Sequence, residues 1–519
     1  MPVYAAIDIG SNSVKMLCAE ASATGVTRVL VEERKVTRIG QSVFSEGAIN
    51  SETLKMVSEV LAQMRASYQA WDPVAVRVVA TSAVRDARNQ EAFLQSAHLA
   101  LGMEVEIISG LEEARLVHLG VVSHETHPPK RALLIDVGGG SAEFIVSEDG
   151  AMGPAFSKPL GAVRLWQTFL TQDPPTDAQL RQLDEFIDEK IGEAKSGFGD
   201  DRFEIAIGTS ASAFALVCAA LGIPRINREQ AAGLRVSREQ VEAVYLALRR
   251  MSLAERRRVT GIGPRRAEIV VPGVALFRRA MDAFDIGELI VSRAGVREGI
   301  IVDLARRGVG KERLLLNDDQ RCVVRSLSEK FGIASRRGQK VAELAVDLFA
   351  GLRSLHRLPH AFCRALEAAA YLMDTGHYVS ATKHHKHSFY LVSNVDLPGF
   401  TVEERRLVAL LCRYHRKAMP SASHPEFVER PEAERNALLL LIPLLRLADA
   451  LDRSKEQRVQ QVFCRIGPQT VTLQVKHNGT MELECWAVQG VSSVFRSIYR
   501  RSLELEAESD SGLCRMLRS

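Results

Sequence analysis

The sequence predicts a multidomain protein, with two similar α/β domains followed by an all-helical domain and a small α+β domain. The chain has 519 residues, which is too long for one hydrophobic core and suggests roughly three or four domains. One strand–turn–strand pattern occurs twice, and the alternation of strands and helices stops after Asn317. The predicted domains are residues 1–128, 129–310, 311–456 and 457–519.

The repeated pattern is the part of the sequence that indicates chemistry. It reads AAIDIGSNSVKMLCAE at residues 5–20 and LLIDVGGGSAEFIVSE at residues 133–148, so that Asp8 aligns with Asp136. Each copy is an apolar strand ending in Asp, a turn of small residues and a second strand. Such turns let consecutive backbone N–H groups point at one anion, and a carboxylate suits the Mg²⁺ that accompanies phosphates. We therefore expect two similar lobes facing a shared phosphate-binding cleft.

In the first two domains, strand-like and helix-like patterns alternate, which is typical of α/β architecture. The first domain is predicted to contain strands at 3–9, 74–80 and 105–108 and helices at 52–70 and 89–101. A segment with two prolines, 124–130, is predicted to be a linker. The second domain is predicted to contain strands at 132–136, 143–147, 204–207 and 288–291, with helices between them.

The last two domains have different patterns. Helix-length segments with almost no strand pattern follow Asn317 up to about residue 454, which predicts an all-helical domain. From residue 460 the pattern alternates again. It predicts strands at 462–466, 470–475 and 481–486 and a helix at 491–503.

The composition restricts the class of protein. The sequence is 46% hydrophobic and 25% charged, as in ordinary globular proteins, and it has no apolar run of the roughly 18 residues that span a membrane. It starts with a strand pattern and no leader-like segment. Its eight cysteines form no CxxC pair, so we expect reduced thiols and a cytoplasmic location. A net charge of +4 is small for this length, and we expect neither nucleic acid nor membrane as a partner.

Residues 107–115 form a strand end followed by the start of a helix. Ser109 and Glu112 have the spacing of a capping box, which gives Glu112 a structural role. Glu113 has no such role. It is either a favourable acid in the first helical turn or, in a phosphate cleft, the base that activates water.

Three other positions have two interpretations each. Arg85 follows the strand at 74–80 and either clamps a phosphoryl oxygen or is a solvated residue of a first helical turn. Glu143 either joins Asp136 around a metal ion or faces outwards from its strand. The turn at 207–210 either holds a further phosphate at a helix N-terminus or is a simple connection.

The helical domain has two clusters of basic residues, at 383–387 and 413–417. A metal-hydrolase site, a surface that binds a long anion and a solvated helix face are the three interpretations. The phosphate cleft expected upstream favours the anion-binding surface.

Taken together, these motifs resemble the exopolyphosphatase / guanosine pentaphosphate phosphatase family over nearly the full length. The segments that carry the resemblance are DIGSNS (8–13), TSAVRDARN (81–89), ISGLEEARL (108–116), IDVGGGSAE (135–143), IGTSAS (207–212), RAEIVVPG (266–273) and GVREG (295–299). The resemblance implies an actin/hexokinase/Hsp70-type (ribonuclease H-like) fold for the first two domains, with the active site between them. It also implies stepwise hydrolysis of a terminal phosphate.

The resemblance assigns roles to individual residues. It implies that Glu113 activates water with Glu112 beside it, and that Arg85 stabilises the phosphoryl group. It implies a Mg²⁺ site, for which Mn²⁺ is an alternative, at Asp8, Asp136 and Glu143. The phosphate-binding residues are expected to be Gly10, Ser11, Asn12, Ser13, Gly138, Gly139, Gly140 and Ser141, extended by Gly208, Thr209 and Ser210. A basic channel for a polyanion is expected at Lys383, Lys386, His387, Arg413, His415, Arg416 and Lys417.

The helical domain resembles the HD metal-hydrolase fold but departs from its site. That site needs a His, a His-Asp pair and a later Asp. Here the pair reads Met373-Asp374 and the first position holds Arg337, so that Asp374 and Asp449 alone remain. Two carboxylates without histidines make a poor transition-metal site, and we expect no catalysis in this domain.

The sequence leaves several functions open. An exopolyphosphatase is the leading hypothesis, a phosphatase that converts pppGpp to ppGpp is the alternative, and one enzyme with both activities fits equally. Sugar kinases and ATPases share the implied fold but need an acceptor pocket. A sensor of polyphosphate or of alarmones with an inactive site is the non-enzymatic hypothesis. The resemblance also suggests a homodimer formed through the C-terminal domains.

Overall fold

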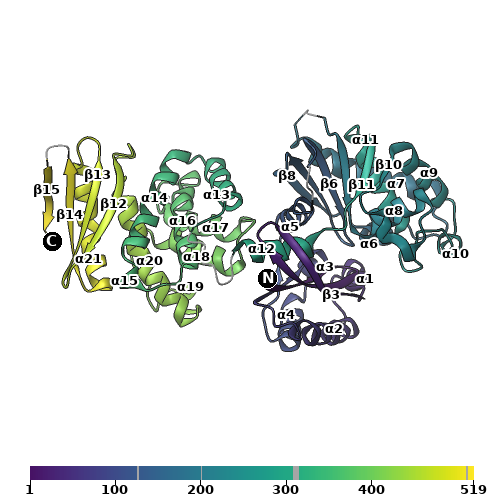
Figure 1. The fold of residues 1–519 in the computed structure, drawn as a ribbon, viewed down its shortest axis with the longest axis horizontal. Helices are drawn as coiled ribbons and strands as arrows, with labels where there is room; N and C mark the ends of the chain where they lie inside the picture. Colours follow the sequence, from purple (N-terminus) through teal and green to yellow (C-terminus); the bar gives the residue numbers. More distant parts are fainter. Residues whose placement is uncertain (125–127, 200–201, 308–314, 510–511, 519) are drawn as a thin grey trace. The chain divides into compact units, whose positions relative to one another are not determined.

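The fold was analysed on a computed structural model, shown in Figure 1, which describes residues 1–124, 128–199, 202–307, 315–509 and 512–518. Contacts divide the chain into two compact units, Met1–Gly310 and Lys311–Ser519. Each unit is described by itself. Part of the predicted linker 124–130 lies outside the described residues.

The first sheet has five strands in the order β3-β2-β1-β4-β5. β1, β2 and β3 are antiparallel neighbours, whereas β4 is parallel to both β1 and β5. The strands are β1 (Val3–Ile9), β2 (Ser13–Ser22), β3 (Gly25–Val36), β4 (Ala75–Ala80) and β5 (Glu106–Ile107). The helices are α1 (Ile39–Glu46), α2 (Ser51–Gln69), α3 (Ser82–Asp86), α4 (Gln90–Leu101) and α5 (Gly110–Val122). The predicted strand 3–9 and the helices 52–70 and 89–101 are confirmed within two residues.

The second sheet has six strands in the order β10-β11-β9-β6-β7-β8. Read from its hairpin side, β8-β7-β6-β9-β11 repeats the order of the first sheet. The strands are β6 (Arg131–Val137), β7 (Ala142–Glu148), β8 (Ala151–Lys158), β9 (Ile205–Thr209), β10 (Arg235–Ser237) and β11 (Glu288–Val291). The helices are α6 (Ala162–Phe169), α7 (Asp177–Lys195), α8 (Ser210–Leu221), η1 (Arg225–Ala231), α9 (Arg238–Leu248), α10 (Leu253–Arg256), α11 (Val270–Ala283) and α12 (Val296–Arg307). The repeated sequence pattern thus corresponds to a repeated topology, which is consistent with an actin-like fold.

The two sheets share part of their hydrophobic core. α5 follows the first sheet in the chain but packs on β7 and β8, whereas α12 follows the second sheet and packs on β1 and β2. One buried cluster combines Ala6 of β1, Leu116 of α5, Leu134 of β6 and Ile300 of α12. The apolar area buried there stabilises both α/β domains at once, so that each depends on a helix of the other.

The second unit combines helices with a four-stranded sheet of order β12-β13-β14-β15. Its helices are α13 (Asp318–Lys330), α14 (Ser335–Gly351), α15 (Arg353–His356), α16 (Ala361–Leu372), η2 (Thr375–Tyr378), α17 (His384–Asn394), α18 (Val402–Tyr414), α19 (Pro425–Val428), α20 (Glu432–Ala450) and α21 (Glu482–Tyr499). Its strands are β12 (Val459–Ile466), β13 (Thr470–His477), β14 (Ser502–Ser509) and β15 (Gly512–Arg518). One hydrophobic core extends from the helices to this sheet.

The predicted strand at 481–486 is wrong, because these residues begin α21. Met481, Val488, Phe495 and Tyr499 are buried, and their spacing is that of one helical face rather than of an alternating strand. Glu484 is also buried, because its carboxylate accepts the Ser454 N–H at 2.9 Å. The polar residue Glu484 occupies a position on the buried face of the helix, so the sequence did not show the apolar spacing of a helix there.

Two further findings concern the described residues alone. No single helix among them is long and apolar enough to cross a membrane, while the bent pair of α8 and η1 meets the length and composition criteria together. The seven cysteines whose side chains the structure describes form no disulfide bond.

Candidate active site

The turns between β1 and β2 and between β6 and β7 lie against each other. A Cβ atom added to Gly139 would lie 2.9 Å from Cβ of Ser11 and 3.3 Å from the backbone N of Asn12. At Gly140 it would lie 2.4 Å from Oγ of Ser82 and 2.5 Å from the ring of Phe44. Both distances at Gly140 are too short for real Cβ contacts. The consecutive glycines therefore let one predicted phosphate loop approach the other, a reason that the sequence did not reveal.

Three predicted carboxylates lie at the ends of the two central hairpins, where Asp8 corresponds to Asp136 and Lys15 corresponds to Glu143. Asp8 pairs with Lys15 across β1 and β2, and Lys15 Nζ lies 3.3 Å from its Oδ2. Asp136 pairs with Glu143 across β6 and β7. Thr209 donates a hydrogen bond of 2.6 Å to Oδ1 of Asp136. The internal repeat thus brings the strand-end aspartates of both domains to one site.

Glu143 is fully buried, and no lysine, arginine or histidine of the described residues forms an ion pair with it. Ser157 donates to its Oε1 at 2.8 Å, while Oε2 accepts no hydrogen bond from the described residues. Burial and the neighbouring Asp136 raise the pKa of Glu143 to about 8. Burial also raises the pKa of Asp136, although the Thr209 hydrogen bond and Lys15 oppose this. An excess of buried negative charge here is the environment in which a divalent cation is favoured.

Glu113 lies in the first turn of α5 and faces the same group of carboxylates. Its side chain is buried, and Arg85 Nη1 lies 3.7 Å from its Oε2. Burial and the Glu143 carboxylate hold the pKa of Glu113 well above its ordinary value; Arg85 opposes the shift, and Asp8 and Asp136 add to it. A buried carboxylate with a raised pKa is suited to accept a proton near neutral pH.

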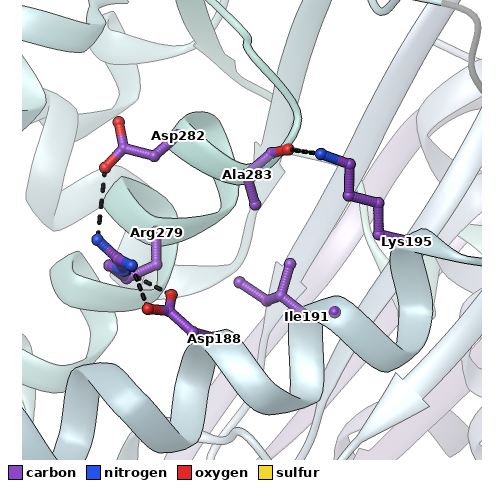
Figure 2. Close-up of a pocket in the computed structure, with 7 residues that line it drawn as sticks. Asp188, Ile191, Lys195, Arg279, Asp282 and Ala283 are labelled. Carbon is purple, nitrogen blue, oxygen red and sulfur yellow. Dashed lines mark hydrogen bonds and ion pairs between the residues drawn. The ribbon is translucent and has the colours of Figure 1, made fainter.

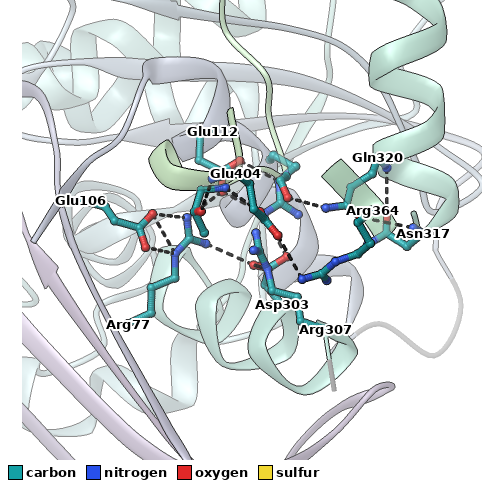
Figure 3. A network of polar contacts seen from close by, with 12 residues as sticks. Arg77, Glu106, Glu112, Asp303, Arg307, Asn317, Gln320, Arg364 and Glu404 are labelled. Atoms are coloured by element: carbon teal, nitrogen blue, oxygen red, sulfur yellow. Dashed lines mark hydrogen bonds and ion pairs between the residues drawn. The ribbon is translucent and has the colours of Figure 1, made fainter. Parts of the chain in front are cut away.

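Glu112, the neighbouring residue, belongs to a buried ion-pair network (Figure 3). Arg115 Nε lies 2.8 Å from its Oε2, and Arg77 Nη2 lies 3.2 Å from its Oε1. Both arginines also bind Asp303 of α12, at 3.0 and 3.2 Å. Burial alone would raise the pKa of Glu112, but Arg115 and Arg77 hold it below its ordinary value. Ser109 caps the helix by accepting the Glu112 N–H at 3.2 Å, and the Glu112 carboxylate is held by the arginines.

A cluster of arginines lies near Asp8. Burial and the charges of Arg228, Arg297 and Arg225 lower the pKa of Arg34, and Asp8 opposes this shift. Burial and Arg34 lower the pKa of Arg266 to about 9. Arginines paired with carboxylates show the opposite shift, as Arg77 does. This cluster therefore has an excess of positive charge beside the carboxylates, which favours an anionic ligand.

The third predicted phosphate turn joins β9 to α8. Ser210 has a φ of 78°, an uncommon conformation for a residue with a side chain, and it begins the helix. Thr209 is buried with its hydroxyl on Asp136. The turn thus positions one of the carboxylates, and the N-terminus of α8 begins next to that contact.

One pocket of the first unit lies apart from these residues. It has a volume of about 290 Å³ and is lined by α7 and α11 (Figure 2). Arg279 lies between Asp188 and Asp282, and Lys195 donates to the carbonyl of Ala283. Its charged groups therefore already have partners within the pocket, and no predicted site residue lines it.

Comparison with known protein families shows which family the chain belongs to. The sequence profile of the Ppx/GppA phosphatase family matches residues 19–307, and the profile of Ppx/GppA phosphatase domain III matches residues 320–486. The chain belongs to the Ppx/GppA phosphatase family. This confirms the resemblance, and with it the reading of the protein as a phosphatase.

Characterised and structurally solved members of the family resemble the chain to different extents. The guanosine-5'-triphosphate,3'-diphosphate pyrophosphatase of Vibrio vulnificus (strain YJ016) is 26% identical over 463 residues, 88% of each chain. The crystal structure of an exopolyphosphatase-like protein is 30% identical, with a TM-score of 0.55, and covers 59% of this chain and 98% of its own. The Ppx/GppA family member of Aquifex aeolicus is 26% identical, with a TM-score of 0.52, and covers 58% and 97%.

The basic residues predicted in the Ppx/GppA domain III differ in exposure. Lys383, Lys386, Arg416 and Lys417 are exposed, whereas His387 and Arg413 are half-buried. His415 is buried, with Nε2 3.2 Å from Nε2 of His384. The prediction that His415 contributes to an anion-binding surface is therefore wrong, because the side chain points into the unit.

Several residues of the site were missed by the sequence reasoning. Lys15 and Arg34 interact with Asp8, Ser157 binds Glu143, and Arg266 lies beside Arg34. Arg266 lies in a segment that resembles the family, which was a usable signal. No such signal existed in the sequence for Lys15 and Ser157. Lys15 reaches Asp8, and Ser157 reaches Glu143, each from a neighbouring strand.

Proposed function

We propose that this protein is an exopolyphosphatase that hydrolyses the terminal phosphate of inorganic polyphosphate and releases orthophosphate. The observation that carries this proposal is the buried Glu113 carboxylate, beside Arg85 and near Asp8 and Asp136, which precede the two facing turns of small residues. Hydrolysis of a phosphoanhydride needs a base for water, a cation for the phosphoryl oxygens and donors for the phosphates. Residues suited to each of these roles lie within one unit.

Mg²⁺ is the cofactor that fits the acidic residues. Asp8, Asp136 and Glu143 are oxygen donors, and Oε2 of Glu143 accepts no hydrogen bond from the described residues. Mg²⁺ usually keeps several waters and binds through one or two carboxylates together with substrate phosphates. When bound, Mg²⁺ would neutralise part of the phosphate charge at the reacting end of the substrate. The same residues would accept Mn²⁺.

In the proposed reaction, Glu113 accepts a proton from water as the water oxygen forms a bond to the terminal phosphorus. The bridging P–O bond breaks, its electrons remain on the shortened chain, and orthophosphate leaves. Arg85 stabilises the charge of the phosphoryl group. Backbone N–H groups and hydroxyls of the turns at Gly10–Ser13 and Gly138–Ser141, and of Gly208–Ser210, hold the phosphates in place. Glu112 acts as a positioning residue through Arg77 and Arg115.

The arginine cluster around Arg34 and Arg266 supports a substrate with more than one phosphate beyond the cleavage point. A polyphosphate carries about one charge per unit, and such a chain is attracted by an excess of arginine charge. Removal of pppGpp's terminal phosphate is the second candidate activity. It is favoured by the 26% identity, over 88% of each chain, to the Vibrio vulnificus pyrophosphatase. Both substrates require Glu113.

Orthophosphate release with Mg²⁺ tests the proposal. Long-chain polyphosphate and pppGpp are compared at equal concentrations of terminal phosphate. Preference for long chains is expected. Preference for pppGpp would replace the proposal by the second candidate. Binding of both substrates without release would indicate a sensor and contradict both enzymatic functions.

A further inference from the structure

Three side chains of the second unit converge on one point that the phosphatase reaction does not use. Asp374 follows α16, His384 begins α17, and His415 caps the C-terminus of α18. One ligand atom from each lies within 4.8 Å of the other two. His384 Nε2 lies 3.2 Å from His415 Nε2 and 3.8 Å from Asp374 Oδ1. This is the one such group of His, Cys, Asp and Glu among the described residues.

The hydrogen bonds of the two histidines point a lone pair from each ring at the same place. His415 Nδ1 lies 2.8 Å from the Cys412 carbonyl, and His384 Nδ1 lies 3.3 Å from the Ala381 carbonyl. A carbonyl only accepts, so each Nδ1 carries the hydrogen, and each neutral ring keeps a lone pair on Nε2. Two lone pairs at 3.2 Å repel each other unless a cation lies between them.

An alternative tautomer would need a donor for Nδ1 of His384. Arg416 Nη1 is near, at 3.2 Å from Nδ1 and 3.4 Å from Nε2. An atom almost equally distant from both ring nitrogens does not lie along the lone pair of either, because these lone pairs diverge in the ring plane. Arg416 therefore does not determine the tautomer of the ring.

The carboxylate is oriented in the same manner as the histidines. Arg337 Nε donates to Oδ2 of Asp374 at 2.9 Å, which leaves Oδ1 facing His384. Arg337 also binds Oδ1 of Asp449 at 2.8 Å. The two carboxylates that the sequence analysis retained from an HD-type site are thus joined by a guanidinium. Asp374, His384 and His415 are thus each held by a hydrogen bond to an arginine or a backbone carbonyl. Metal ligands are usually oriented in this way.

We propose that Asp374, His384 and His415 bind one divalent transition-metal ion. Two imidazole nitrogens and one carboxylate oxygen form a ligand set that suits Zn²⁺ and related ions, with a further position open to water or an anion. The group of side chains reaches the surface, because the side chain of Asp374 is 15% exposed and that of His377, which stacks on His384 at a centroid distance of 3.8 Å, is 45% exposed. The ion would tie α17 and α18 to the end of α16.

The test is metal binding by the purified full chain after removal of metal with a chelator. Co²⁺ is titrated in the presence of excess Mg²⁺, the visible bands of bound Co²⁺ are recorded, and Zn²⁺ then displaces the Co²⁺. Saturable binding of one Co²⁺ ion per chain is expected. His384→Ala, His415→Ala and Asp374→Asn should each weaken it by about 100-fold or more.

Matched controls separate this site from others. His356→Gln removes a buried histidine of the same unit, whose Nε2 lies 2.8 Å from the Phe349 carbonyl, and Glu143→Gln alters the acidic cluster of the first unit. Both variants should still bind one Co²⁺ ion per chain. Zn²⁺ should also raise the thermal unfolding midpoint of the wild type but not of Asp374→Asn, whose side chain has nearly the same size. Absence of a saturable equivalent, or an equivalent that all three ligand variants keep, would mean that the histidines form only a hydrogen-bonded pair and would overturn the proposal.

Discussion

Glu112 and Glu113 are neighbours in the chain, yet their carboxylates have opposite pKa shifts. Glu112 faces Arg77 and Arg115, and Glu113 faces Glu143, Asp8 and Asp136. The one-residue difference in helical position decides which environment each side chain meets. The two residues can therefore be separated by experiment.

Glu113→Gln should lower phosphate release by about 10²–10⁴-fold, because the amide cannot accept the proton of water. The free energy of unfolding should not fall, since the amide has nearly the same size as the carboxylate and removes a charge that burial and Glu143 disfavour. Glu112→Gln should instead reduce the free energy of unfolding by about 3–5 kcal/mol, because buried arginines lose part of their counter-charge. Turnover and urea denaturation of both variants are the measurements. Equal turnover by Glu113→Gln and wild type would contradict the base assignment.

His118 on α5 predicts a pH dependence of stability. Its ring is buried with Nε2 3.1 Å from Oγ of Ser147, and burial, with a smaller effect of Arg306, lowers its pKa from 6.5 to about 4. The unfolded state therefore binds more protons than the folded state between pH 6.5 and 4. The contribution of the neutral His118 ring to the free energy of unfolding is fully present above pH 6.5. It is lost as the pH falls, by at most about 3 kcal/mol at pH 4.

His118→Gln should flatten this dependence, because the amide keeps a polar partner for Ser147 but does not titrate. Urea denaturation of both proteins at several pH values between 4 and 8 is the measurement. The difference in unfolding free energy between wild type and variant should shrink on acidification. A constant difference would show that His118 is not responsible.

At the scale of elements, the turn between β6 and β7 is defined by its approach to the turn between β1 and β2. Gly140→Ala places a methyl group 2.4 Å from Oγ of Ser82 and 2.5 Å from Phe44. We expect at least about a tenfold loss of turnover, because displaced catalytic groups lose their geometry. Gly192→Ala is the matched control, since its Cβ would meet nothing within 4 Å, and alanine in helix α7 should stabilise by about 1 kcal/mol. Normal turnover by Gly140→Ala would show that the two turns can separate freely.

The elements also show where the sequence pattern was sufficient and where it was not. The strand 3–9 and the helix 52–70 have clear periods, and both were predicted within two residues. The segment 481–486 was predicted as a strand although it begins α21. Glu484 lies on the buried face because the Ser454 N–H reaches its carboxylate, and a contact between residues 30 positions apart cannot be read from local alternation.

At the scale of the whole molecule, each of the two units joins two predicted domains through a common hydrophobic core. The α/β domains exchange α5 and α12, and the helices of the second unit share one core with its sheet. A cut at residue 128 or 456 would therefore expose apolar surface in both products. A cut near residue 310 falls between the compact units.

The fragment 1–310 should therefore fold cooperatively and release phosphate from short polyphosphate with Glu113-dependent turnover. The exopolyphosphatase-like protein that covers 59% of this chain over 98% of its own length supports the independence of this unit. Circular dichroism and phosphate release, compared with the full chain, are the measurements. If the second unit captures long chains, the fragment should lose the preference for them. An unfolded fragment would contradict the division at residue 310.

The sequence by itself determined the duplicated strand–turn–strand pattern, the family and the candidate base Glu113, because these depend on local residue order and on a repeat. Tertiary structure decided which charges surround each glutamate, how the glycines of one turn accommodate the other and how Lys15 reaches Asp8. It also decided that His384 and His415 meet at Asp374, although they are 31 positions apart in the chain. The physical reason is that burial and neighbouring charge set the chemistry of a side chain, and both arise only when distant segments pack together.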